Sequence, residues 1–381
     1  MKYKLSDICD YHKGKVEVSS LDENTYISTE NMLPNKAGIT EASSLPNTNQ
    51  TQVFNKGDVL VSSIRPYFKK IWYAKFDGGC SNDVLVMRAK ENVDSQYLYY
   101  VLSNDAFFDY SMATSKGTKM PRGDKKALME YEVPCFEPEE QVKIARLLGA
   151  IDEKIQLNTE INKNLLEQAL CIYASLINGK PQNGCIGDYC TVKSGFAFKS
   201  KWWQDSGVPV IKIGSINQDN LNLLDCSYVS EDKITLAKDF MVSGGDLVIA
   251  MTGATIGKFT MVPKTTEAIL VNQRVGKFFL GENPVSRIPF IYCTLKQPEV
   301  ISEIINRGQG SAQPNISATD IMAIPCVIPQ PAEINLYNEQ TAPMFELIIN
   351  NQFENQTLTN TRDSLLPRLM SGDIDISTIS L

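Results

Sequence analysis

The chain has 381 residues, of which 43% are hydrophobic and 21% charged, with a formal net charge of −7. This length predicts two domains, and the composition is that of a globular protein rather than a disordered or strongly basic one. No run reaches the roughly 18 apolar residues of a membrane span. The nine cysteines include no Cys-x-x-Cys pair, so we expect reduced thiols and a cytoplasmic protein.

The first domain, residues 1–137, is predicted to combine short strands with one helix. The helix is expected over 95–110, and the polar stretch 34–50, rich in Pro, Gly, Asn and Ser, is predicted to be a loop. The strands are β-branched and aromatic runs bounded by turn-forming residues, at 59–63, 71–74 and 84–88.

A long helix is predicted over 138–178. Apolar residues recur at alternating steps of four and three from Ile144 to Leu176, which keeps one stripe facing a partner helix. Pro138 suits the first turn, and Gly179 and Pro181 stop the helix. About 40 residues at 1.5 Å each make a rod of roughly 60 Å.

The remainder repeats this plan after a linker at 179–184. A second domain is expected over 185–330, a second long helical region over 331–372 and a tail over 373–381. Its predicted helix covers 289–306. The expected strands are 208–213, 246–251, 258–262 and 274–279.

The repeat is visible residue by residue. The stretch 56–61 parallels 244–249, and 5–9 parallels 186–190. Adding 193 to the seam positions of the first helix from Ile151 onward gives seam positions of the second. Pro343 is expected to break the second helix or to mark a fresh start of it, because proline in a helix interior costs about 3 kcal/mol. Arg362 is an unusual seam residue, and it is expected to extend toward water or face a partner subunit.

Both seams carry asparagines, which permits a register prediction. In an antiparallel pair, Asn158 should face Asn355 and Asn162 should face Asn351. The alternative is that these asparagines sit at a wet, loosely packed point. The residues predicted to pair the helices are Ile151, Ile155, Asn158, Asn162, Leu165, Ile348, Asn351, Asn355 and Leu358.

Positive charge gathers in domain loops despite the acidic total. Five basic residues face one acid in 56–76, and five face one in 115–126. Flexible basic loops with aromatic and amide side chains suit phosphates and base edges, although solvated faces and ordinary turns explain the same residues. The DNA-binding candidates are Arg65, Tyr67, Lys69, Lys70, Lys116, Thr118, Lys119, Arg122, Lys199, Thr252, Lys258, Ser311, Gln313 and Asn315.

Catalytic motifs are not found in the sequence. One histidine, His12, makes a Ser-His-Asp or Cys-His site hard to build, and no Cys/His spacing suits zinc. The stretch 253–259 departs from a P-loop, because its spacer is short and Phe259 replaces the residue that holds magnesium. We therefore expect a recognition protein with no catalytic and no metal site.

The chain resembles the specificity subunit of type I restriction–modification systems over nearly its whole length. The resemblance rests on PEEQVKI at 138–144, LGAIDEKI at 148–155 and RDSLLPRLMSG at 362–372, after two repeated domains. It implies an α+β fold with two similar target-recognition domains and two long antiparallel helices in a coiled coil, related by a pseudo-two-fold repeat. The first domain and the second would each read half of an asymmetric, bipartite double-stranded DNA site.

The resemblance also implies partners. The helices would dock two methyltransferase (M) subunits, and the assembly would recruit restriction (R) subunits. S-adenosylmethionine, ATP and magnesium would be used by those partners, with no cofactor in this subunit and no membrane contact. Two other classes stay open: a coiled-coil protein–protein scaffold with two adaptor domains, and a stand-alone nuclease or methyltransferase with an unfamiliar site.

Overall fold

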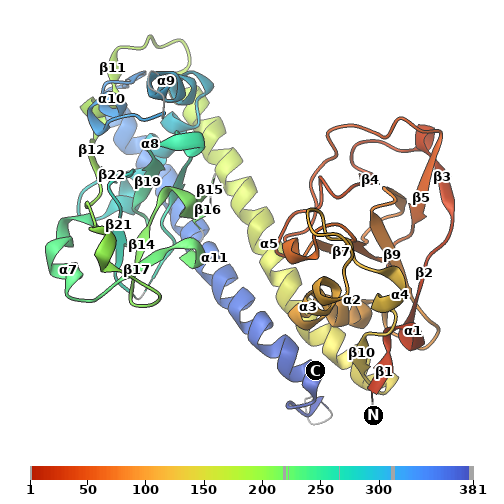
Figure 1. Ribbon diagram of the computed structural model, residues 1–381. Coiled ribbons are helices and arrows are strands. Elements are labelled where there is room, and N and C mark those ends of the chain that lie inside the picture. The colour runs from red at the N-terminus through yellow and green to blue at the C-terminus, as the bar shows by residue number, and fades with distance from the viewer. Residues whose placement is uncertain (1, 218–219, 222, 266, 310–313, 377–381) are drawn as a thin grey trace. The chain divides into compact units, whose positions relative to one another are not determined.

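The computed structural model describes residues 2–217, 220–221, 223–265, 267–309 and 314–376 (Figure 1). The chain divides into two compact units. Unit 1 comprises Met1–Glu153 and Leu358–Leu381, and unit 2 comprises Lys154–Thr357. Two long helices, α5 (Pro138–Ile177) and α11 (Pro331–Ser371), each contribute residues to both units. Within the described ranges, no helix is long and apolar enough to cross a membrane.

Unit 1 contains two four-stranded sheets. The first is antiparallel, and its strands in spatial order are β2 (Cys9–Tyr11), β9 (Val84–Ala89), β6 (Val59–Ser62) and β7 (Ile71–Tyr73). The second sheet has the order β3 (Lys15–Glu17), β5 (Gln50–Phe54), β8 (Gly78–Cys80) and β4 (Tyr26–Ile27), with a parallel pair between β4 and β8. The three strands predicted from the sequence are β6, β7 and β9.

Unit 2 repeats this sheet arrangement. Its antiparallel sheet has the order β12 (Thr191–Ser194), β22 (Val275–Phe279), β19 (Leu247–Ala250) and β20 (Phe259–Met261). Its second sheet has the order β13 (Trp203–Gln204), β17 (Ser227–Val229), β14 (Val208–Ile211), β21 (Ile269–Val271) and β18 (Met241–Val242), again with one parallel pair, β14 and β21. The hairpin β15 (Ile216–Asn217) and β16 (Asn220–Leu221) is separate.

Short elements flank the sheets in matching places. In unit 1 these are β1 (Lys2–Lys4), α1 (Leu5–Ile8), α4 (Lys125–Leu128) and β10 (Glu132–Pro134). In unit 2 they are β11 (Gly184–Cys185), α6 (Ile186–Tyr189), α10 (Ala318–Met322) and β23 (Pro325–Cys326), and unit 2 has in addition α7 (Lys233–Leu236) between β17 and β18. The backbone N–H before α1 and that before α6 each donate to an aspartate of the first turn at 2.8 Å, Asp7 and Asp188 respectively.

The repeated sequence 56–61 and 244–249 forms the same turn twice. Gly57 has φ +92° and Gly245 has φ +89°, a conformation that suits glycine. The following aspartate folds back on the turn in each copy and meets a cation of the neighbouring strand. Asp58 accepts from Arg88 Nε at 2.7 Å, and Asp246 accepts from Lys277 Nζ at 3.1 Å.

Each predicted domain helix is in fact two helices. In unit 1 the expected helix over 95–110 is interrupted at Asn104, which is extended and caps the next helix through Ala106 N–H at 3.1 Å. In unit 2 Pro298 begins a new helix because proline suits a first turn. The helices are α2 (Ser95–Ser103), α3 (Asp105–Ala113), α8 (Ile288–Leu295) and α9 (Pro298–Gly308).

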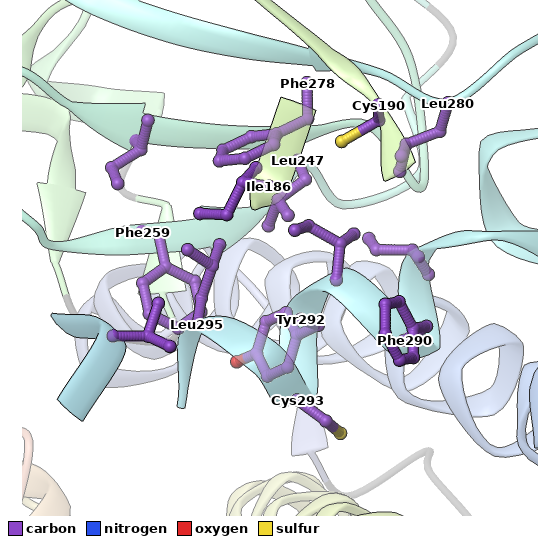
Figure 2. Close-up of a cluster of buried hydrophobic side chains, with 14 of the residues drawn as sticks. Ile186, Cys190, Leu247, Phe259, Phe278, Leu280, Phe290, Tyr292, Cys293 and Leu295 are labelled. Carbon is purple, nitrogen blue, oxygen red and sulfur yellow. The ribbon is translucent and has the colours of Figure 1, made fainter. Parts of the chain in front are cut away.

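Helix α8 lies in the core of unit 2, with all eight residues buried (Figure 2). Tyr292 contacts Phe259 of the sheet, with ring centroids 5.2 Å apart, and Phe345 of α11 at 5.4 Å. A helix that is apolar on every side is stable only when it is covered on every side. In unit 1, Leu148 of α5 and Leu369 of α11 join the buried cluster.

The long helices pair in the predicted register. Asn158 Nδ2 donates to Asn355 Oδ1 at 2.9 Å, and Asn351 Nδ2 donates to Asn162 Oδ1 at 2.8 Å, both within unit 2. Asn158 is 1% exposed, so the wet-seam alternative does not apply to it. All nine residues predicted to pair the helices are buried or half-buried.

Two expectations about α11 are wrong. The helix continues through Pro343, which lies on an exposed face, so water can donate a hydrogen bond to the helix carbonyl that has lost its N–H donor. Arg362, which was expected to extend to water or face a partner subunit, is instead turned inward, with its side chain 20% exposed. Its Nη1 contacts Asp152 Oδ1 of α5 at 2.8 Å, inside unit 1, and Tyr100 donates to the other oxygen of Asp152 at 2.7 Å.

Candidate nucleic-acid interface

Two basic loops predicted to bind DNA, 65–70 and 115–122, lie together in unit 1. Arg65 N–H donates to Pro121 O at 2.8 Å, and Gly123 N–H donates to Ser63 O at 2.9 Å. These bonds tie the second loop to the end of β6. Candidates that are separated in the sequence by about 50 residues therefore share one surface.

Four of the eight candidates in unit 1 have partners inside the unit. Each contact neutralises or occupies a cationic head, which limits its availability to phosphates. The pairs are Lys69 with Asp105 at 2.8 Å, Lys70 with Thr29 O at 2.6 Å, Lys116 with Asp124 at 2.5 Å, and Arg122 with Asp83 at 3.3 Å.

The side chains of Arg65, Tyr67, Thr118 and Lys119 are exposed, and no side-chain hydrogen bond or ion pair is found for them among the described residues. Tyr67 is 48% exposed and packs on Phe68 with ring centroids 4.6 Å apart. Arg65 has φ +49° and Lys69 has φ +50°, so both residues that flank the 3-10 turn Pro66–Phe68 adopt the left-handed conformation although neither is glycine. Strain of this kind, about 1–3 kcal/mol per residue, clusters at functional sites.

The ionisation of this surface follows from its contacts. Burial lowers the pKa of Lys70. The Lys116 ammonium and two backbone N–H groups hold the pKa of Asp124 at about 2. Partial burial alone would raise the pKa of Asp105, but Lys36 and Lys69 together hold it below its usual value. Asp105 and Asp124 are therefore ionised at neutral pH.

In unit 2 the corresponding loops line an open cavity of about 510 Å³. Thr252 and Asn315 are joined by a β-bridge at its edge, and both were DNA-binding candidates. Thr252 Oγ1 is buried and has no hydrogen-bond partner among the described residues. Ser311 and Gln313, two further candidates from the same loop, lie outside the described residues.

An aromatic group formed by Phe196 and Trp202 is connected to this cavity through Gln273, whose N–H donates to Phe196 O at 3.0 Å. The rings of Phe196 and Trp202 stack with centroids 6.4 Å apart and an interplanar angle of 14°. Lys199 lies over Trp202 at 5.4 Å from the ring centroid. Lys258 is half-buried and separate from this group.

Sequence reasoning missed Arg274 and Gln273, which line the cavity. Arg274 was assigned to the predicted strand 274–279 and Gln273 was assigned to no element, so their position at the cavity was not visible from the sequence. Over the described part of the chain, no group of three or more His, Cys, Asp or Glu side chains could hold a metal ion.

Comparison with known proteins gives matches over both halves of the chain. The family model described as "Type I restriction modification DNA specificity domain" matches residues 1–167 and again 179–360. The MjaIX specificity subunit of a type I restriction enzyme from Methanocaldococcus jannaschii is 23% identical over 353 residues, covering 86% of this chain and 80% of the relative. The MjaVIII specificity subunit from the same organism is 23% identical over 404 residues, covering 99% and 93%.

A solved structure shares the fold. The crystal structure of the type I restriction–modification system S subunit from M. genitalium matches with a TM-score of 0.58 and 18% identity, covering 97% of this chain and 96% of that one.

Proposed function

Because the chain belongs to the type I restriction–modification DNA specificity family, we propose that it is the DNA-recognition subunit of such a complex. It recognises a DNA sequence in a restriction–modification complex and carries no catalytic step itself. The observation that carries this proposal is the duplication: the same family domain and the same pair of sheets occur in each half.

Two reading heads that differ in their loops support an asymmetric target. We define the first head as the loops 64–70 and 115–122 of unit 1, and the second head as the residues around the cavity of unit 2. The first head exposes Arg65 and Lys119, whereas the second exposes Arg274 and the neutral amides of Gln273 and Asn315, with Lys199 nearby. Different side chains select different base edges, so the two half-sites are proposed to differ.

The chain is acidic overall and its positive charge is concentrated in loops, which favours DNA binding at those loops over nonspecific attraction by the whole surface. The exposed lysines would contact phosphates and set the register, while arginine and amide side chains would read base edges. Partners of the chain are DNA together with methyltransferase and restriction subunits. Two methyltransferase copies, docked on the long helices, are the proposed arrangement, and S-adenosylmethionine, ATP and magnesium would be used there.

The rival reading is a coiled-coil scaffold whose two units bind proteins. The two readings differ in duplex binding. The test is fluorescence anisotropy of a labelled duplex, titrated with the chain assembled with its methyltransferase subunit over a range of salt concentrations. We expect an affinity that falls linearly with the logarithm of salt concentration. A scaffold would show no salt-dependent binding.

A further inference from the structure

The two heads share equivalent backbone hydrogen bonds at the end of a central strand. At the end of β6, Ser63 N–H donates to Asp83 O at 2.8 Å, and at the end of β19, Met251 N–H donates to Arg274 O at 3.0 Å. Asp83 and Arg274 each directly precede the neighbouring strand, β9 and β22 respectively. Arg274 therefore occupies in unit 2 the place that Asp83 occupies in unit 1.

A second equivalence lies opposite this position. Ile64 forms an antiparallel β-bridge with Arg122, and Thr252 forms one with Asn315. The pattern places Asn315 where the first head has Arg122. The first head thus has the pair Asp83 and Arg122, and the second head has Arg274 and Asn315 at the equivalent positions. The arginine precedes the strand in the second head instead of lying in the loop, and neither of the two residues there is an acid.

The exchange changes the charge available at the surface. In unit 1, Asp83 Oδ1 lies 3.3 Å from Arg122 Nη1, so the guanidinium is held by its own unit. In unit 2, Arg274 is exposed, and its guanidinium has no hydrogen bond or ion pair within the described ranges. The described residues lining the cavity include no acid that could neutralise it.

The neighbours of Arg274 favour a ligand that both donates and accepts hydrogen bonds. Gln273 and Asn315 line the same cavity with amide side chains, and the buried Thr252 hydroxyl has no partner among the residues described. A phosphate offers only acceptors and would leave the amide oxygens without donors. Base edges in the major groove present donors and acceptors side by side, and guanine O6 and N7 match the two-pronged guanidinium.

On the basis of the proposed function, we propose that Arg274 is a specificity-determining residue of the second head that reads a guanine in the second half of the DNA target. Asn315 and Gln273 would contact the edges of neighbouring bases. The first head has no free cation at the equivalent position, so its half-site is read by other residues.

The test is a genome-wide map of methylated adenines in cells that express the chain with its methyltransferase subunit, repeated for Arg274→Ala and Arg274→Lys. We expect Arg274→Ala to reduce discrimination by about 5- to 150-fold at one G·C pair of the second half. The first half should keep its sequence. Arg274→Lys keeps the charge but loses the fork geometry, so the same position should relax while overall methylation stays closer to wild type.

The matched control is Lys264→Ala, which removes an exposed cation. Lys264 lies beside Gly244, close to the first residue of β19, whereas the cavity lies at the last residue of that strand. It should leave the map unchanged. Unaltered maps for both Arg274 variants, or methylation lowered uniformly at every site, would overturn the inference, since the latter indicates a phosphate contact. If Arg274→Ala does not fold, Arg274→Lys decides alone. A wild-type map without a two-part target would instead contradict the proposed function.

Discussion

The buried asparagine Asn158 offers a sensitive test of the helix pairing, through the substitution Asn158→Asp. Its Nδ2 donates both to Asn355 Oδ1 at 2.9 Å and to the Glu354 carboxylate at 2.7 Å. This amide helps to lower the pKa of Glu354, and Lys154 contributes further. The substitution keeps the shape of the side chain but replaces the shared donor with a second carboxylate.

The magnitude follows from the contacts. Leaving one buried charge uncompensated costs about 3–5 kcal/mol. Here Glu354 is 45% exposed and Lys154 lies 3.3 Å from it, so part of the repulsion is screened. We expect Asn158→Asp to lower the free energy of unfolding by about 2–4 kcal/mol at pH 8.

The loss should depend on pH with a known sign. Burial beside Glu354 would raise the pKa of the introduced carboxyl above its ordinary value of about 3.9. The folded variant then binds a proton at higher pH than the unfolded chain does, so its deficit shrinks as pH falls through the raised pKa. Urea unfolding followed by circular dichroism at pH 8 and pH 5 measures this change.

Asn164→Asp is the matched control, because Asn164 is exposed on the same helix. It should change the free energy of unfolding by no more than about 0.5 kcal/mol. An Asn158→Asp variant as stable as the control at pH 8, or a deficit independent of pH, would refute the seam contacts.

Three further predictions concern the loops and the packing. Lys119→Ala should weaken binding to all duplexes alike and reduce the salt slope by about 1, measured by anisotropy at several salt concentrations; a change in sequence preference would contradict a phosphate role. Asp58→Ala should lower the free energy of unfolding by about 2–4 kcal/mol in denaturant titrations, because the Asp58 carboxylate is 2% exposed and its removal leaves Arg88, which is 40% exposed, with Asn55 as an uncharged acceptor only; an unchanged value would contradict that role. Pro343→Ala should stabilise the chain by about 1–3 kcal/mol, since alanine restores the N–H of a continuous helix; destabilisation would show that the proline is required.

The sequence predicted the features that depend on period. The heptad steps located both long helices, and the seam asparagines predicted which residues face each other, because spacing along a helix determines which side chains share a face. The duplicated turn at Asp58 and Asp246 was visible as a repeated string of residues. In each case local pattern and tertiary contact agree.

The features that sequence missed depend on tertiary contacts. Asn104 reads as an ordinary helix residue until its role as a cap is seen. Pro343 is tolerated because its face of α11 is exposed, and the inward position of Arg362 follows from its ion pair with Asp152, 210 residues away. Arg274 looked like the first residue of a strand, and only the bridge between Thr252 and Asn315 brings the cavity around it.

The central claim is that two similar heads in one chain each read part of one DNA target. Its most direct test is the positions of methylated adenines in a genome where the chain is expressed with its methyltransferase subunit. Two short, different sequences separated by a constant number of unread base pairs are the predicted result. A single continuous sequence, or a map that is unchanged when the chain is omitted, would contradict the account.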